Sequence, residues 1–168
     1  MLLSPSSAGR FIDTYMAFLG SLVSDQEKQG KPPSRWLVLG RARYDADRSL
    51  LTRYRATLAQ ADDEILDAIA GLKIGRWVYL KDTRNYSVLI ADDGSTAYGV
   101  LGLTDRLRVV AQGESGVVMK AGLFALHGHW ICDGLIENMT WLGPSLRRDI
   151  TAIYQRMRNE GKFSLRAD

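Results

Sequence analysis

Both histidines and the only cysteine of this 168-residue chain lie in one short stretch, residues 126–135 (LHGHWICDGL). If this stretch were a straight strand, His127, His129 and Asp133 would point to the same face, because side chains alternate along a strand. Two imidazoles and a carboxylate on one face have the composition of a facial metal triad. The nearby Cys132 raises a second hypothesis, a thiol activated by a histidine.

The glycine between the histidines favours a turn instead. Gly128 separates two apolar runs, and a tight hairpin needs a residue of this kind where the backbone turns. In such a turn His127 and His129 diverge at a solvent-exposed tip, and the chain has no third histidine to complete a site. His129 and Cys132 would also lie on opposite faces of the following strand. We therefore predict a structural turn, with no metal and no cofactor.

Other catalytic patterns are weaker. No glycine-rich phosphate-binding pattern occurs, and the adjacent carboxylates Asp92 and Asp93 lie in a predicted turn, where Asp bonds its own backbone. No catalytic residue is therefore assigned. We expect Gly134 to allow a strand bend or close packing under the last helix, so that Gly134→Val would destabilise the protein through strain and overpacking.

The composition is that of a globular protein, with 46% hydrophobic and 24% charged residues. One cysteine excludes a disulfide framework and a multi-cysteine zinc site, which favours a reducing compartment. The chain starts without a recognisable targeting segment, and its longest apolar stretch is too short to span a membrane. We predict a cytoplasmic protein with no membrane span.

The net charge of +3 is mild but unevenly distributed. Residues 35–60 are rich in arginine, residues 61–70 hold only acidic charges, and the last 24 residues are basic again. Such blocks can bind nucleic acid, but mixed-sign helix surfaces are also what solubility requires.

The first half of the chain has helical periodicity. Apolar residues recur by threes and fours from Phe11 to Val23, and again from Leu50 to Leu72. The second series predicts either one long helix or two, since Asp62 and Asp63 would cap a new start. The type of the short apolar piece Trp36-Leu37-Val38-Leu39 stays undecided.

From Arg76 onward the period changes to two. The predicted strands are Trp77–Lys81, Tyr86–Ala91, Thr96–Leu101, Leu107–Ala111, Gly116–Leu126 and Trp130–Leu135. The gaps between them are too short for crossover helices, which favours an antiparallel meander curling into a partly open barrel. A closing amphipathic helix from Ser145 to Asn159 has its apolar face at Leu146, Ile150, Ile153, Tyr154 and Met157.

These elements predict an α+β fold, with N-terminal helices, a curled antiparallel sheet and a closing C-terminal helix. The helical part should cover residues 1–74 and the sheet with its helix residues 75–168, together in one compact unit. The apolar stripe of the first helix either packs on the sheet or pairs with a second copy, so a homo-oligomer is one open alternative.

Residues 75–163 resemble a pattern found in uncharacterised bacterial proteins. The pattern has a Y-G-V-x-G-L-T strand, here YGVLGLT, then a hairpin followed by D-G-L, and a glycine before a basic closing helix. In that pattern lysine or arginine often flanks the glycine at the positions of His127 and His129, which supports a turn. The resemblance implies shared architecture and no activity.

Two classes of function remain. The first is a non-catalytic binding or regulatory module whose sheet and helix present a groove to a protein or small ligand, similar to pleckstrin-homology-like domains. The second is a nucleic-acid-associated protein, and an enzyme of unfamiliar type is a distant third. The residues for an anion or partner contact are the arginines of the closing helix: Arg147, Arg148, Arg156 and Arg158. The alternative is that these arginines only solubilise the helix and pair with Asp149 or Glu160.

Overall fold

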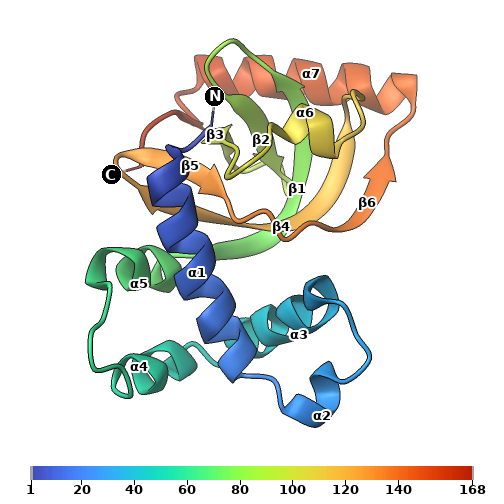
Figure 1. Cartoon of the computed structure of the whole chain (residues 1–168). Helices are drawn as coiled ribbons and strands as arrows, with labels where there is room; N and C mark the ends of the chain where they lie inside the picture. The colour runs from blue at the N-terminus through green and yellow to red at the C-terminus, as the bar shows by residue number, and fades with distance from the viewer. Residues whose placement is uncertain (1, 168) are drawn as a thin grey trace. The chain divides into compact units, whose positions relative to one another are not determined.

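A computed structural model of the chain describes residues 2–167 and divides into two compact units (Figure 1). The helical unit spans Pro5–Leu72, and the sheet unit takes the described residues on either side of it. The α+β class is confirmed, with N-terminal helices, a mostly antiparallel sheet and a C-terminal helix. No helix among residues 2–167 is long and apolar enough to cross a membrane.

Five helices make up the helical unit: α1 (Pro5–Ser21), α2 (Asp25–Lys28), α3 (Pro33–Ala46), α4 (Ser49–Arg55) and α5 (Asp63–Ala70). Helix α1 contacts both α3 and α5. A glycine lets α1 and α3 approach closely, because a Cβ at Gly40 would lie 2.4 Å from the carbonyl oxygen of Leu19. Phe18 and Tyr44 fill the space beside it with an edge-to-face ring contact at 5.0 Å.

The structure settles two of the open questions about these helices. The apolar series from Leu50 to Leu72 forms two helices, and the carboxylate of Asp62 caps the second one by accepting the N–H of Ile65. The undecided piece beginning at Trp36 lies within α3. Asp62 caps because its short side chain reaches the backbone donors that the first turn of a helix leaves free.

The described part of the sheet unit holds seven strands and two helices. The strands are β1 (Lys73–Asp82), β2 (Ser87–Ala91), β3 (Ala97–Leu101), β4 (Val117–Leu126), β5 (His129–Cys132), β6 (Glu137–Trp141) and β7 (Phe163–Ser164). The helices are α6 (Leu107–Val110) and α7 (Pro144–Asn159).

Five of the strands close into a ring in the order β1-β2-β3-β5-β4, because β4 pairs back onto β1. Strand β6 pairs with β4, and β7 pairs with β3. The sheet is mostly antiparallel, as predicted, but it is not a simple meander, since β3 runs parallel to both β5 and β7. Strands β1 and β3 run in the same direction, because both are antiparallel to β2. Strand β5 is antiparallel to β4, which is antiparallel to β1, so β5 also runs in the direction of β3.

The ring separates two apolar cores. The inner core lies inside it and includes Trp77, Leu89, Tyr98 and Met119. The outer core joins the outward-facing residues of β1, β2 and β3 to the buried face of α7, and it includes Tyr154. Alternate residues of one strand enter different cores, as the two faces of a strand require.

Three segments differ from the predicted strands, and one of them is the short β7, which was not predicted. Residues 107–110, predicted as part of a strand, form the short helix α6. Leu107 at its start and Ala111 just after its end are four residues apart, and both are buried in the inner core. That spacing places them on one helical face. Strand β6 was not predicted, because its sequence ENMTW has no clear apolar alternation.

Candidate anion-binding surface

The residues around His127 form a hairpin turn. Leu126 and His129 are paired across β4 and β5, and the two residues between them have φ values of 51° and 72°. Two positive φ angles in a two-residue loop are typical of the type I′ turn. Both histidines are exposed, and the carbonyl of Gly128 accepts the N–H of Ala167 at 3.2 Å. Within residues 2–167 no three His, Cys, Asp or Glu side chains gather in a way that could hold a metal ion.

The buried carboxylate of Asp133 holds the backbone where β5 ends. Its Oδ1 accepts the N–H of Gly122 at 3.0 Å and that of Leu135 at 3.1 Å, while the N–H of Asp133 donates to the Gly122 carbonyl. Only 4% of the residue is exposed. Asp133 therefore continues the hydrogen bonding between β5 and β4 by one residue and partly through its side chain, which is a structural role.

Gly134 follows with φ of +77°. The nearest atom to a Cβ built on this residue would be Leu103 Cδ2 at 3.7 Å, an ordinary contact, and no atom of α7 is among its near neighbours within the described chain. The expected close packing under the last helix is therefore wrong. The positive φ is what requires a glycine here.

Helix α7 buries a face slightly different from the predicted one. Tyr154 and Met157 are buried, and Ile150 and Ile153 are half-buried, but Leu146 is 54% exposed. The next residue, Arg147, takes the place expected for Leu146. An arginine can do so because its aliphatic stem packs on apolar surface while its charged head stays in water.

The stem of Arg147 lies over Gly116. A Cβ at Gly116 would be 2.3 Å from Arg147 Cγ and 2.7 Å from its Cδ, so this contact requires a glycine. Gly116 also has φ of +69°. The guanidinium beyond the stem lies 3.6 Å from the carboxylate of Glu114. Arg147 is thus fixed through its carbons, while its charge makes only a loose ion pair.

A wide, open hollow of about 660 Å³ lies beside the first turns of α7. Its lining residues are Ser115, Pro144, Arg147, Arg148 and Thr151. Two of the four predicted arginines therefore share one concave surface with hydroxyl groups. The first turn of α7 contains no acidic residue. The Thr151 hydroxyl donates to the Arg147 carbonyl at 2.8 Å.

The other two predicted arginines lie at the far end of the same helix. The guanidinium of Arg158 lies 6.0 Å from the centre of the Tyr154 ring. Lys162, and to a smaller degree Arg156, lowers the pKa of Glu160. The structure therefore does not bring the four arginines together. It divides them into a pair at the hollow and a pair more than two turns away.

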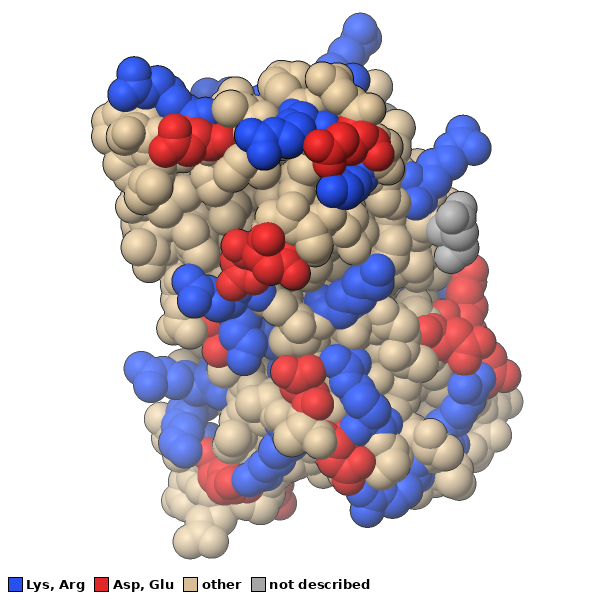
Figure 2. Space-filling view, turned by 180° about the vertical axis from the view of Figure 1, so that it is seen from behind, with Lys and Arg blue, Asp and Glu red and all other residues tan. Residues whose placement is uncertain are grey.

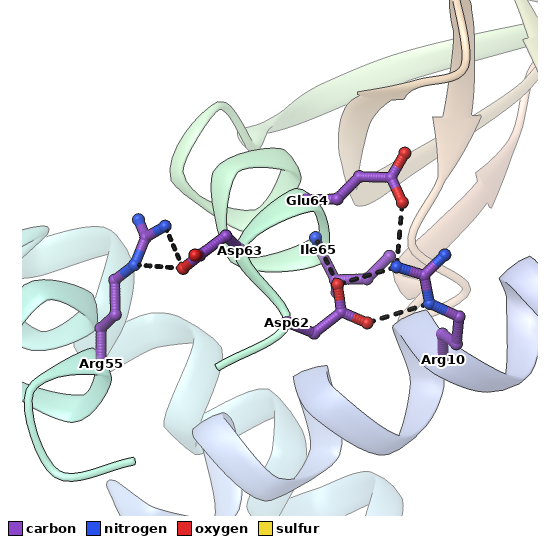
Figure 3. Close-up of polar contacts among 6 residues, drawn as sticks. All are labelled: Arg10, Arg55, Asp62, Asp63, Glu64 and Ile65. Carbon is purple, nitrogen blue, oxygen red and sulfur yellow. Dashed lines mark hydrogen bonds and ion pairs between the residues drawn. The ribbon is translucent and has the colours of Figure 1, made fainter. Parts of the chain in front are cut away.

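Most arginines of the helical unit have carboxylate partners. Arg10 of α1 reaches Asp62 and Glu64, and Arg55 at the end of α4 reaches Asp63, as Figure 3 shows. Basic and acidic side chains accordingly lie next to one another on this unit, in the lower part of Figure 2. The basic and acidic blocks of the sequence thus pair with each other locally on this unit.

Sequence reasoning missed the hydroxyls of the hollow. Ser115 lies on the segment before β4 and Thr151 one turn after Arg147, so only the packing of α7 on that segment, at Gly116, brings them together. No spacing in the sequence could have indicated this. Comparisons of the chain with protein-family models, with curated proteins and with solved structures found no match.

Proposed function

We propose that the protein is a non-catalytic binding module whose sheet unit takes an acidic group of a protein partner or small ligand. The contact surface is the hollow at the start of α7. The observation that carries this proposal is the charge left without a partner there: among the described residues, Arg148 has no carboxylate within ion-pair distance, and Arg147 has only the 3.6 Å contact with Glu114.

Guanidinium groups suit such a role. Their donors form a planar fork that matches a carboxylate or phosphate with two parallel hydrogen bonds. The stem of Arg147 is already fixed against Gly116, so less side-chain freedom is lost when its head engages a ligand. An open hollow also admits a group that belongs to a larger partner.

Nucleic acid is the alternative partner for these arginines. Its bases would find no free aromatic platform on the outer face of β1, β2 and β3, because α7 covers that face with Tyr154 and Met157. The division of the arginines into two separated pairs also gives no continuous track for a phosphate backbone. We therefore favour a single acidic group over a strand of nucleic acid.

The test is an NMR titration of the full ¹⁵N-labelled chain with inorganic phosphate and, separately, with a short glutamate-rich peptide. The test variant is Arg147→Gln with Arg148→Gln, in which glutamine keeps the Cβ, Cγ and Cδ atoms that pack on Gly116. The matched control is Arg156→Gln with Arg158→Gln, which removes the same charge from the same helix away from the hollow.

We expect saturable shifts at Ser115, Arg148 and Thr151, and a loss of affinity of about tenfold or more in the test variant only, since charge-assisted hydrogen bonds contribute about 1.5–3 kcal/mol. Equal losses in both variants would indicate general charge attraction and contradict the proposal. Tight binding of single-stranded DNA that weakens steeply with salt would favour the nucleic-acid alternative.

A further inference from the structure

A corner of two aromatic rings lies at the end of the ring of strands where β1 begins. Tyr98 of β3 and Trp130 of β5 have ring centroids 5.1 Å apart, with their planes at 74°. Trp77 of β1 meets Tyr98 edge to face at 5.6 Å. Tyr98 and Trp77 belong to the inner core, and Trp130 packs against it. The two ring faces of the corner therefore stand nearly at right angles.

A cation already occupies this corner. The ammonium of Lys73 lies 4.5 Å from the centroid of the Trp130 ring and 5.2 Å from that of Tyr98, and it is 3.4 Å from the Tyr98 hydroxyl. Lys73 and Trp77 lie on the same face of β1. The residue between them on that face is Gly75, so no side chain separates them. The lysine forms no ion pair with any described carboxylate. Aromatic faces take that role here, as ring quadrupoles attract cations.

The corner is held by contacts that do not involve the lysine. The indole N–H of Trp130 donates to Ser164 Oγ at 2.9 Å and to the Arg166 carbonyl at 3.1 Å. The indole N–H of Trp77 donates to the carbonyl of Ala121 at 3.0 Å. Lys73 itself is exposed. Its side chain can turn into water while the rings keep their positions.

We propose that the corner of Tyr98 and Trp130 is a binding site for trimethylammonium groups, and that Lys73 is its internal competitor. A trimethylammonium group donates no hydrogen bond and prefers aromatic faces, which is how aromatic cages recognise choline and methylated lysine. A lysine ammonium is more strongly hydrated and is therefore the weaker occupant. This site is separate from the hollow at α7, and the proposal does not depend on the function assigned to that hollow.

The probe is choline, titrated into the full ¹⁵N-labelled chain while the indole N–H signal of Trp130 is followed. Trp130→Phe assigns that signal; if this variant does not fold, single replacements of the other three tryptophans assign it by elimination. A neutral molecule of the same shape, 3,3-dimethyl-1-butanol, separates charge from apolar contact. Free trimethyl-lysine, as a second probe, separates a lysine source of the group from a choline source.

We expect choline to shift the Trp130 signal saturably, with an affinity at least about fivefold higher than that of the neutral molecule. Lys73→Ala should bind choline more tightly than the native protein, because the competitor is gone. The matched control is Lys81→Ala, which removes another lysine that lies over an aromatic ring, 5.7 Å from the centroid of Tyr154, and should leave the affinity unchanged.

Three results would overturn the proposal. The first is the absence of a saturable shift in both the native protein and Lys73→Ala. The second is equal binding of choline and the neutral molecule, which would show that charge plays no part. The third is a Lys73→Ala affinity no higher than the native one, which would show that Lys73 does not compete.

Discussion

In the helical unit, polar side chains mostly contact one another at the surface, whereas in the sheet unit they mostly hold the backbone. Arg10, Arg43 and Arg55 each engage carboxylates on another segment of the helical unit. In the sheet unit, the Asp133 carboxylate accepts two backbone N–H groups and the Trp77 indole donates to a carbonyl. The arginines of α7, in the sheet unit, have few carboxylate partners, and the distance is 3.6 Å for the pair of Arg147 with Glu114.

This difference follows from how each unit makes its backbone hydrogen bonds. Helices satisfy their backbone internally, so charged side chains on short helices can pair between neighbouring segments. In the ring of strands, bulges and strand ends leave some backbone groups without a partner on the neighbouring strand. The N–H of Gly122 is one of them, and it donates to the side chain of Asp133. The paired arginines of the helical unit therefore resemble in sequence the arginines of α7, which have few carboxylate partners.

The largest effect is expected from Asp133→Ala. It removes the acceptor of two N–H groups, of which that of Gly122 is buried. A buried donor without a partner costs about 1–3 kcal/mol, so the free energy of unfolding should fall by roughly 3 kcal/mol. Urea unfolding measures it. Asp133→Asn keeps an acceptor oxygen and should lose clearly less; an equal loss would show that the charge, and not the acceptor, matters.

A smaller but still marked effect is expected from Gly134→Val. A β-branched residue at φ of +77° is strained, at a cost of about 1–3 kcal/mol. The matched variant is Gly134→Asn, since asparagine tolerates this conformation better. Thermal unfolding of both variants checks the order. Equal melting temperatures for Val and Asn would mean that the backbone at this residue relaxes.

The third prediction compares the arginines of the two units directly. Arg10→Gln with Arg55→Gln should lower the melting temperature, because it removes the ion pairs with Asp62, Glu64 and Asp63. Replacing the four arginines of α7 with glutamine should leave it nearly unchanged. The loss in the first variant should shrink at high salt, as expected of exposed ion pairs. Equal losses in both variants would remove the contrast between the units.

The smallest effect concerns pH. Hydrogen bonds from Arg43, and then from Ser24, hold the pKa of Glu27 at about 2, below its ordinary 4.5. A depressed pKa stabilises the fold above the unfolded value, and that contribution is lost as pH falls from about 4.5 through about 2. The protection factors of the amides in α2 and α3, which correct for the pH dependence of intrinsic exchange, should therefore fall over this range in the native protein. Glu27→Gln should show a smaller change, and an identical acid response would contradict the assignment.

Periodicity alone predicted much of the fold. It located α1, α5 and α7, and strands close to β1, β2, β3, β4 and β5, because an amphipathic period is a local property of the chain. The prediction failed where the packing of a segment in the fold differs from what its local apolar pattern indicates. The segment from Leu107 is apolar enough for a strand, yet the inner core needs only Leu107 and Ala111 from it, at helical spacing.

The sequence by itself determined the α+β class, the hairpin turn at Gly128, and a set of arginines on the last helix. Only the tertiary structure decided that β5 enters between β3 and β4, since strand order depends on which distant edges pair. It also decided which arginines are neutralised and which are not. Arg55 and Arg148 look alike in sequence, and they differ because the fold brings Asp63 to the first and no described carboxylate to the second.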